Sequence, residues 1–434
     1  MNLIEIYQFE CSGDPQEAAE QLCQEQSTAQ WKRLGVDEDF RPKHGAKIID
    51  LVVTPANAGV QSYIVKIAHP IINFGAKIPN LLTAVAGEGA FFSPNIKTIK
   101  LIDLEFPEEY LAQFQGPQFG IAGIRDLLNI HDRPIFLGVV KPNIGLSPAD
   151  FAELAYQSWL GGLDAPKDDE MLADVEYSPF SERMEILGKL RKKAEAETGE
   201  KKMFIANITD EVDCLQELHD VAVKNGINAV MLNAWCVGLS AARCLRKKSR
   251  VPLVSHFDFV AAFSRVPNFG VSQLVAIKLQ RLAGFDVMIL PGMGVRMQTT
   301  EEELRANIQA CVGPMGNIKP ALPVPGGSDW AGTVPVLYKK MQGYSPSPLV
   351  GEGLRPLAEG GGEGRSPQGC SPQGWRAIDF GMVPGRGVFN HPSGPKAGAK
   401  SFRQAWEAIA QKIPIEEQKR KCPELAAAYQ KFQV

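Results

Sequence analysis

The segment GGLDAPKDDE, residues 161–170, decides how the surrounding sequence is interpreted. Its apolar first half is typical of a short buried strand, and the strand ends in Lys167 followed by three carboxylates. Side chains alternate across a strand, so we expect Lys167 and Asp169 on one face and Asp168 on the other. Glu170 follows where the strand gives way to a loop and can turn toward Lys167. The segment therefore predicts one amine and two carboxylates that converge on one point.

Eight short apolar runs, separated by amphipathic segments of helix length, begin near residue 130. They are residues 135–140, 163–166, 203–208, 229–234, 252–256, 287–290, 321–324 and 380–383. This alternation is typical of parallel strands joined by helices, and eight units predict a (β/α)8 TIM barrel. Polar or glycine-rich residues follow the runs, where barrel enzymes carry their chemistry. They are Lys141, Asn143, residues 167–170, Asn207, Asn233, His256, and residues 292–296, 326–328 and 385–387.

The first 125 residues have a different order of elements. Strand-like runs at residues 3–9, 47–53, 61–68 and 98–106 and helical stretches at 15–26 and 80–86 give a β-α-β-β-α-β order, which predicts a ferredoxin-like α+β domain. We therefore expect two domains, residues 1–125 and 126–434, with C-terminal helices closing the barrel. Residues 345–376 are rich in Gly, Pro and Ser, and we expect an inserted surface loop without a catalytic role.

Composition excludes several classes of function. The chain is 44% hydrophobic and 22% charged with a net charge of -3, which is typical of a soluble globular protein and argues against nucleic acid or a membrane as partner. No apolar run approaches the roughly 20 residues of a membrane span, and the N-terminus lacks an export signal, so a cytoplasmic location is expected. The eight cysteines include no CxxC pair and are read as reduced thiols, and no histidine pair has zinc spacing.

Lys167, Asp169 and Glu170 suggest a magnesium site, but only if the lysine changes chemically. Oxygen ligands suit Mg²⁺, and an ammonium group has no lone pair to offer. A neutral lysine amine can add CO₂ to form a carbamate, whose oxygens resemble those of a carboxylate. The alternative is an ordinary Lys–Asp ion pair at the mouth of the barrel, and the spacing alone does not decide between the two.

The remaining candidates surround the same barrel mouth. The glycine loops after strands seven and eight would bind phosphate through backbone N–H groups, or are plain turns; their residues are Gly326, Gly327, Gly385, Arg386 and Gly387. Lys141 is a candidate electrostatic stabiliser or proton carrier, or else the partner of a nearby acid. His256 is either catalytic or a core histidine. Asn207 and Asn143 are candidates for binding a metal-bound water or the substrate.

Several motifs together resemble the RuBisCO large-subunit superfamily. They are GVVKPNIGLSP (138–148), GGLDAPKDDEMLAD (161–174), the Gly-Gly pair after strand seven, PGRGVFNHPSG (384–394) and QEQSTAQW (24–31). Residues 25–40, 68–89 and 394–409 look most similar to form IV RuBisCO-like proteins of green sulfur bacteria and other phototrophs. The similarity covers nearly the whole chain except residues 345–376.

The resemblance implies a set of roles and an assembly. It implies that a carbamylated Lys167 holds Mg²⁺ with Asp169 and Glu170, that Lys141 and His256 lie near the reacting carbons, and that Gly327, Gly385 and Gly387 surround a phosphate. It also implies a head-to-tail homodimer, in which Glu25 and Asn80 of one subunit complete the partner's active site.

Departures from the family pattern set the predicted chemistry. RuBisCO has a lysine where Asn143 stands and a phosphate-binding arginine where Phe257 stands, and residues 292–296 lack the lysine of its mobile loop. An apolar Phe257 cannot hold a second phosphate. In the RuBisCO-like enolases of methionine salvage a lysine near the position of Asn80 acts as base, and this sequence looks different there. We therefore predict no CO₂ fixation on a bisphosphate, and a substrate with at most one phosphate.

The leading hypothesis is a Mg²⁺-dependent enzyme that enolises or isomerises a phosphorylated keto-sugar derivative, with sulfur metabolism or methionine salvage as its setting. One alternative is a catalytically silent homologue with a binding or regulatory role. Another is a Schiff-base aldolase that uses Lys141 or Lys167 as nucleophile.

Overall fold

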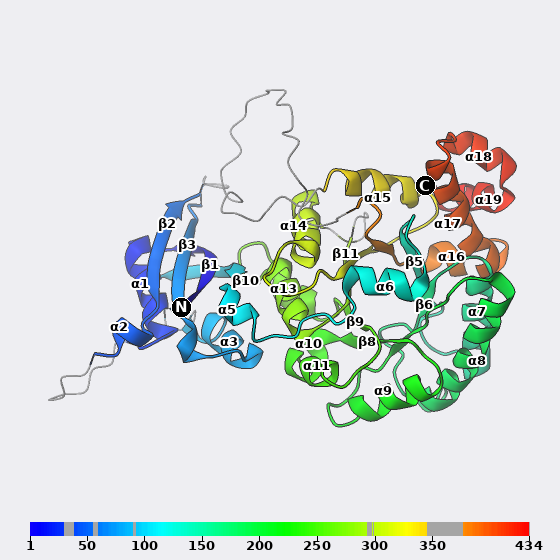
Figure 1. Ribbon diagram of the computed structural model, residues 1–434. Coiled ribbons are helices and arrows are strands. Elements are labelled where there is room, and N and C mark those ends of the chain that lie inside the picture. The colour runs from blue at the N-terminus through cyan, green and yellow to red at the C-terminus, as the bar shows by residue number, and fades with distance from the viewer. Residues whose placement is uncertain are drawn as a thin grey trace.

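The computed structural model describes residues 1–29, 39–54, 60–89, 93–292, 297, 299–344 and 376–433 (Figure 1). Most of the predicted insertion at residues 345–376, and residues 293–296 of the loop after strand six, lie outside the described part of the chain. Within it, a small N-terminal sheet lies at one end of the molecule and a helix-surrounded barrel occupies the other (Figure 1).

The N-terminal sheet is ferredoxin-like, as predicted. Its strands are β1 (Asn2–Cys11), β2 (Lys47–Val53), β3 (Tyr63–Pro70) and β4 (Ile96–Glu105), in the order β4-β1-β3-β2 with antiparallel pairing. The helices here are α1 (Pro15–Glu25), α2 (Arg41–His44), α3 (Ile78–Val85), α5 (Glu108–Leu111) and the 3-10 helix η1 (Ile71–Asn73). Apolar residues of α1 and α3 share one core with the sheet, among them Leu22 and Leu81.

The predicted TIM barrel is confirmed. Its strands are β5 (Ile135–Val139), β6 (Ala165–Lys167), β7 (Ile205–Asn207), β8 (Ala229–Asn233), β9 (Leu253–His256), β11 (Val287–Pro291), β12 (Leu322–Gly326) and β13 (Gly381–Met382). All neighbours pair in parallel, β13 pairs with β5, and Gly381 packs against Val324 of β12, which closes the ring. The eight apolar runs of the sequence each overlap one strand, because parallel strands covered on both faces are apolar throughout.

Helices surround the barrel strands (Figure 1). They are α7 (Pro148–Leu160), α8 (Phe180–Thr198), α9 (Leu215–Lys224), α10 (Ala234–Val237), α11 (Leu239–Arg246), α12 (Val260–Ser264), α13 (Gln273–Ala283), α14 (Glu301–Val312), α15 (Thr333–Gln342), α16 (Arg386–Phe389), α17 (Gly394–Ala410), α18 (Ile415–Lys421) and α19 (Pro423–Phe432). Local sequence explains several helix starts. Ser147 accepts a hydrogen bond from the backbone of Asp150 at the start of α7, and Thr300 and Glu303 form a capping box on α14.

Side-chain alternation divides the barrel into an inner and an outer core. Along β11, Val287 and Ile289 belong to the inner cluster, whereas Met288 and Leu290 pack with the surrounding helices. In β6, Ala165 belongs to the inner cluster, so the period of two places Lys167 on the inner face as well. Helix α6 (Gly120–Leu128) contributes apolar side chains to the inner cluster and covers the N-terminal end of the barrel. The helix does not cover the opposite end of the barrel, where the carboxyl ends of the strands carry the predicted site residues.

A fifth strand, which the sequence pattern did not predict, joins the N-terminal sheet to the barrel. The two-residue strand β10 (Gly270–Val271) pairs in parallel with β4, and two residues give no readable periodicity. Lys100 of β4 reinforces the junction by donating to the carbonyl oxygens of Ser264 at 2.7 Å and Val266 at 2.6 Å. The sheet is therefore fixed to the barrel by backbone pairing and by a buried ammonium group.

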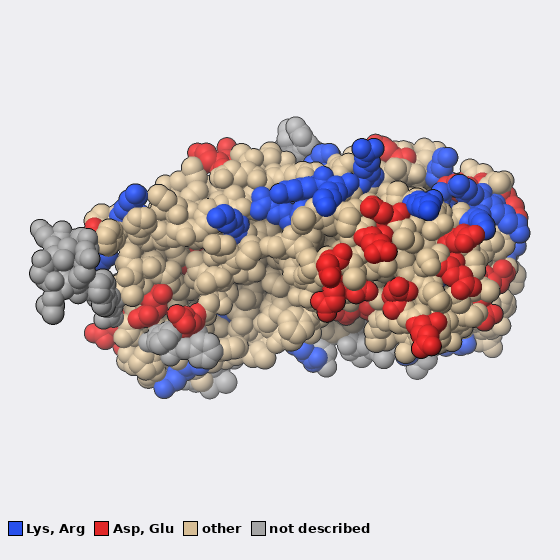
Figure 2. All heavy atoms as spheres, turned by 90° about the horizontal axis from the view of Figure 1, so that it is seen from below, with Lys and Arg blue, Asp and Glu red and all other residues tan. Residues whose placement is uncertain are grey.

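The charges on the surface are grouped by sign. Figure 2 shows basic side chains in a band on one face of the molecule and acidic side chains gathered beside it. The near balance of the two signs agrees with the net charge of -3. Among the described residues, no helix combines the length and the apolarity that a membrane span requires.

Arg125 provides a test of how the barrel is closed. From α6 it donates to Asp379 at 2.7 Å, just before β13, and to the carbonyl oxygens of Ile130 and Arg133. We expect Arg125→Ala to lower the free energy of unfolding by about 3–5 kcal/mol, because a buried carboxylate loses its cation. Urea unfolding followed by circular dichroism measures this loss. Arg41→Ala, which breaks an exposed ion pair, serves as the control and should leave the free energy of unfolding nearly unchanged; equal losses would contradict the prediction.

Candidate active site

Two ion pairs occupy the carboxyl end of β5 and β6. The Nζ of Lys141, just after β5, lies 2.7 Å from Oδ2 of Asp169. The Nζ of Lys167, the last residue of β6, lies 3.1 Å from Oε2 of Glu170. Lys167 and Asp169 are fully buried, and the Glu170 side chain is 22% exposed. Glu170 therefore pairs with Lys167, whereas the carboxylate of Asp169 pairs with Lys141.

Asp168 points away from this cluster, as the strand period predicts. Its carboxylate accepts from the guanidinium of Arg183 on α8 at 3.2 Å and from the backbone N–H of Asn207 at 2.9 Å. Arg183 is itself fully buried and donates to carbonyl oxygens of the loop between β6 and α8. Asp168 thus anchors the strand end on the outside while its neighbours face inward.

Asn207 supports the loop that carries the acidic residues. Its Nδ2 donates to the carbonyl oxygens of Asp169, Glu170 and Leu172, at 3.0 to 3.3 Å, and its Oδ1 accepts from Thr209. We expected Asn207 to bind a metal-bound water or the substrate. In the structure its amide nitrogen is engaged by the backbone of this loop and so positions the two carboxylates, while contact with a metal-bound water or the substrate stays a prediction.

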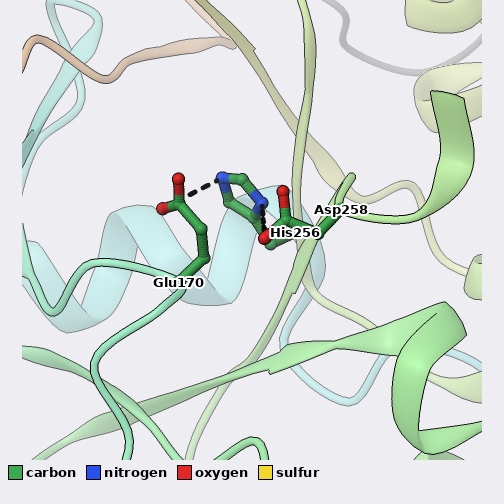
Figure 3. Close-up of side chains that lie close together, drawn as sticks. All are labelled: Glu170, His256 and Asp258. Atoms are coloured by element: carbon green, nitrogen blue, oxygen red, sulfur yellow. Dashed lines mark ion pairs between the residues drawn. The ribbon is translucent and has the colours of Figure 1, made fainter. Parts of the chain in front are cut away.

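His256 lies between two carboxylates (Figure 3). Its Nε2 is 3.5 Å from Oε2 of Glu170, and its Nδ1 is 3.4 Å from Oδ2 of Asp258, without a hydrogen bond at Nδ1. One ligand atom from each of these three residues lies within 4.8 Å of the others, a spacing that could hold a metal ion. The sequence analysis did not single out Asp258. Its place two positions beyond the end of a barrel strand could have indicated it, because barrel enzymes carry functional side chains there.

The charges of the site act on Glu170. Burial alone would raise the pKa of its carboxyl, but the nearby charges of Lys167 and His256 and a backbone hydrogen bond outweigh that effect and lower the pKa to about 2. Asn233, on β8, donates to the Glu170 carbonyl oxygen at 3.1 Å, while its own buried Oδ1 has no hydrogen-bond partner among the described residues. Glu170 is therefore an ionised carboxylate at neutral pH, and its backbone is held by a side chain with an unsatisfied oxygen.

The predicted glycine loops meet beside Lys141. A Cβ on Gly385 would lie 2.9 Å from Cε of Lys141, and one on Gly326 would lie 2.7 Å from Val383. Gly327 has a φ of +127°, which a residue with a side chain rarely adopts. Packing and backbone conformation thus require glycine here, with or without a bound phosphate.

Three further predicted site residues lie in the segments that follow β5 and β13. A Cβ on Gly387 would lie 2.4 Å from the carbonyl oxygen of Asp329. Arg386 begins α16 and is exposed, and Asn143 is half-buried two residues after Lys141. Their predicted contacts with substrate or phosphate stay predictions.

Asp329 is a second residue that the sequence did not reveal. It is buried after the glycines of the seventh loop, and it accepts a hydrogen bond from the backbone N–H of Val383 at 3.3 Å. Burial raises its pKa to about 7, although hydrogen bonds from Val383 and Thr333 act in the opposite direction. Asp329 therefore ties the seventh loop to the eighth strand.

Glu25 and Asn80 lie together, but apart from the barrel cluster. Both line a pocket of about 650 Å³ between α1 and α3. These helices belong to the end of the molecule that carries the small sheet, beyond the barrel strands (Figure 1). Within one chain the structure therefore brings the predicted residues together in two places rather than one.

Comparison with known protein families agrees with this architecture. The model of the ribulose bisphosphate carboxylase large chain, catalytic domain, matches residues 120–353 and 370–432, and that of its N-terminal domain matches residues 2–110. The chain belongs to the RuBisCO large-chain family. The resemblance inferred from the sequence motifs is thereby confirmed.

Four curated relatives at 53–55% identity are carboxylase-like proteins, and carboxylases of Pyrococcus follow at 32%. The chain is 55% identical to ribulose bisphosphate carboxylase-like protein 2 of Rhodopseudomonas palustris, with 99% of this chain and 95% of that protein covered. It is also 55% identical to the carboxylase-like protein of Chlorobaculum tepidum, with 98% and 93% covered. Both organisms and both names agree with the predicted form IV type.

Solved structures of RuBisCO and of a RuBisCO-like protein share the fold. The octameric RuBisCO of Pyrococcus horikoshii gives a TM-score of 0.85 at 29% identity, with 99% of this chain and 93% of that chain covered. A RuBisCO-like protein of Alicyclobacillus acidocaldarius gives 0.84 at 25% identity over 100% of both chains. The RuBisCO fold therefore extends over the whole length of these proteins.

The lowered pKa of Glu170 predicts a pH-dependent stability. A carboxyl whose pKa falls from 4.5 in the unfolded chain to about 2 in the folded chain stabilises the fold above pH 4.5 and loses this contribution as the pH falls to 2. The contribution is at most about 3 kcal/mol. In Glu170→Gln it is absent, so the difference in unfolding free energy from the wild type should shrink between pH 4.5 and pH 2. The exposed Glu176→Gln is the control; a constant difference for Glu170→Gln would contradict the assignment.

Proposed function

We propose that the protein is a non-carboxylating RuBisCO-like enzyme that removes a proton next to the carbonyl group of a phosphorylated keto-sugar derivative, which leads to enolisation or isomerisation. The observation that carries the proposal is the buried cluster of Lys141, Lys167, Asp169 and Glu170 at the carboxyl end of β5 and β6. Two relatives of the chain are named carboxylase-like proteins, which supports a reaction other than CO₂ fixation.

The donor set fits Mg²⁺ once Lys167 carries CO₂. The two lysines and two carboxylates of the cluster balance in charge. Converting the Lys167 ammonium to a carbamate changes the total by two negative charges, which is the charge that a divalent cation restores. The unpaired Oδ1 of Asn233 beside Glu170 is a further sign that the site takes a polar ligand. Lys167, Asp169 and Glu170 would hold the ion through hard oxygen ligands.

Bound Mg²⁺ would polarise a substrate carbonyl and so make the adjacent C–H group more acidic. The chain's own residues do the remaining work. The Lys141 ammonium, held by Asp169 at 2.7 Å, would stabilise negative charge that develops on the carbonyl oxygen. His256 would donate a hydrogen bond to, or exchange a proton with, a substrate oxygen.

One phosphate group suits the glycine loops, and the position after His256 at which RuBisCO has a phosphate-binding arginine holds Phe257. Gly326, Gly327, Gly385 and Gly387 would offer backbone N–H groups to one phosphate. Phe257 packs against the inner core and stacks on His256 at 4.6 Å between ring centroids. An aromatic ring at this position cannot pair with a phosphate. These residues favour a monophosphate over a bisphosphate.

We also propose a head-to-tail homodimer in which the pocket holding Glu25 and Asn80 faces the partner's barrel. Exposed apolar side chains follow the carboxyl ends of the barrel strands, among them Ile144, Met171 and Val212. Apolar side chains gathered at one end of a barrel are typical of a surface that another subunit covers. The octameric assembly named for the Pyrococcus RuBisCO is consistent with an oligomer.

The aldolase alternative has less support than the enolisation. A Schiff-base lysine must lose its proton, and it does so most readily away from carboxylates. Both candidates, Lys141 and Lys167, lie within 3.1 Å of a carboxylate oxygen. Neither lysine therefore stands apart from carboxylates, as a Schiff-base lysine is expected to do.

The test is deuterium exchange at the carbon next to the carbonyl group. Dihydroxyacetone phosphate, ribulose 5-phosphate and fructose 1-phosphate are incubated in D₂O with enzyme, Mg²⁺ and bicarbonate, and proton NMR follows the loss of signal. We expect exchange by the wild type and a decrease of about 100-fold or more in Lys167→Ala. The exposed Lys189→Ala is the control.

Calorimetry separates an enzyme from a silent homologue. The wild type should bind Mg²⁺ more tightly with bicarbonate present than without it, and Lys167→Ala should show no such difference. A wild type whose Mg²⁺ affinity ignores bicarbonate, and which exchanges no deuterium, would favour the silent homologue instead.

A further inference from the structure

The pocket in the N-terminal domain is lined by polar residues that have no role in the metal site of the barrel. Its lining is mainly polar and includes Glu25, Gln26, His69, Asn73 and Asn80. Gln26 presents an Oε1 atom that is buried and has no hydrogen-bond partner among the described residues. Carboxylates and amides in a pocket of about 650 Å³ suit a ligand rich in hydroxyl groups.

A carboxylate and an imidazole form a fully buried pair beneath this lining. Glu5 on β1 and His69 on β3 are both 0% exposed, and Oε1 of Glu5 lies 2.7 Å from Nδ1 of His69. The ring of Phe74 packs edge-on against His69, with 5.3 Å between centroids, and limits its rotation. A carboxylate buried to this degree is costly unless a positive charge or hydrogen bonds stabilise it.

Hydrogen-bond geometry assigns the proton positions on His69. Nδ2 of Asn73 donates to the carbonyl oxygen of His44 at 2.8 Å, and a carbonyl oxygen can only accept, so the orientation of the Asn73 amide is fixed. The same Nδ2 lies 3.2 Å from Nε2 of His69, which must therefore accept as well. The ring proton is then on Nδ1 and is donated to Glu5. Nε2 of His69 then carries a lone pair, which is covered by the amide of Asn73, another residue of the pocket lining.

Tyr7 completes the environment of the carboxylate. Its hydroxyl group lies 2.9 Å from Oε2 of Glu5 and 2.6 Å from the carbonyl oxygen of Val85. Gln26 donates to both the Tyr7 hydroxyl and the Val85 carbonyl oxygen. Burial, and then the charge of Glu5, raise the pKa of Tyr7 well above its ordinary value, so the hydroxyl keeps its proton. Tyr7 can thus donate to Glu5 while Gln26 satisfies the carbonyl oxygen.

We propose that His69 is the base that removes the substrate proton, and that Glu5 stabilises the imidazolium that forms. This inference rests on the proposed function, because it needs the pocket to face the metal end of a partner barrel. A substrate group would displace the Asn73 amide, which is exposed on the short helix η1 and covers Nε2. The hydroxyl groups of the substrate would meet Glu25 and the unpaired oxygen of Gln26.

The proton transfer balances without a further reactant. The C–H bond next to the carbonyl group breaks, and the proton forms an N–H bond at Nε2 of His69. The electron pair of the C–H bond becomes the new C=C bond, and the carbonyl oxygen takes the negative charge. The positive charge of the imidazolium lies 2.7 Å from the Glu5 carboxylate, which lowers the cost of forming it in a buried place.

Deuterium exchange on dihydroxyacetone phosphate, ribulose 5-phosphate and fructose 1-phosphate tests His69 directly. We expect His69→Gln to lower the exchange rate about 100-fold while bicarbonate-dependent Mg²⁺ binding is unchanged, because general bases contribute on this scale. The exposed His131→Gln is the matched control and should exchange at the wild-type rate.

Glu5→Gln is a second test of the proposed base, to be used if His69→Gln does not fold. A glutamine there keeps an oxygen that accepts from Nδ1 of His69 and adds an N–H group that donates to Tyr7, so the buried hydrogen bonds are retained. Only the charge that stabilises the imidazolium is lost. We expect the exchange rate to decrease about tenfold or more, and a rate equal to that of the wild type would overturn the proposal.

The outcomes distinguish this inference from the proposed function. If the wild type exchanges deuterium and Lys167→Ala does not, but His69→Gln exchanges at the full rate, only the assignment of the base is wrong. If the wild type exchanges none of the three probes, the proposed function fails and the role of His69 fails with it. Nitrogen NMR of histidine-labelled protein without ligand adds an independent check. The proton should be on Nδ1 at pH 7, and a proton on Nε2 would overturn the proposal.

Discussion

Two lysine ammonium groups face two carboxylates at the ends of β5 and β6, where Lys167 and Asp169 are fully buried, and they constrain this end of the barrel. Charges in such a place are stable only when each has its partner within hydrogen-bond distance, as Lys141 has Asp169 and Lys167 has Glu170. Lys141 and Asp169 follow neighbouring strands, so their contact depends on the register of the parallel sheet, whereas Lys167 and Glu170 lie three positions apart at the end of the same strand. The same neutral arrangement can accept a doubly charged cation if one lysine becomes an anion.

The surrounding residues fix the strand ends and loops that carry these four side chains. Asp168 and Arg183 anchor the outer side of the strand end, and Asn207 holds the backbone of the acidic loop from the inner side. A loop with its carbonyl oxygens fixed keeps its side chains fixed as well, which is the requirement for a preorganised metal or substrate site. The glycine loops across the mouth are held equally tightly, through Asp329 and its contact with Val383.

The N-terminal domain contributes a different kind of environment. Its pocket is lined by amides and carboxylates, and beneath them a histidine and a glutamate share a proton away from solvent. The barrel offers lysine ammonium groups and the carboxylates that we propose as Mg²⁺ ligands, whereas this pocket offers an imidazole nitrogen and hydrogen-bond acceptors. In our proposal, one subunit's pocket and its partner's barrel supply the two complementary halves that a proton transfer next to a carbonyl group needs.

The sequence by itself determined the barrel, the ferredoxin-like domain and the inward direction of Lys167, because all three follow from the period of side chains along short strands. It also predicted the residues at the strand ends, since parallel strands bring their carboxyl ends to one side. It missed β10, Asp258 and Asp329, whose importance depends on neighbours far away in the sequence. Only the tertiary structure decided that Asn207 supports a loop and that Glu5 and His69, 64 positions apart, form a buried pair. Pairing of this kind is decided by strand register and packing, which no local pattern records.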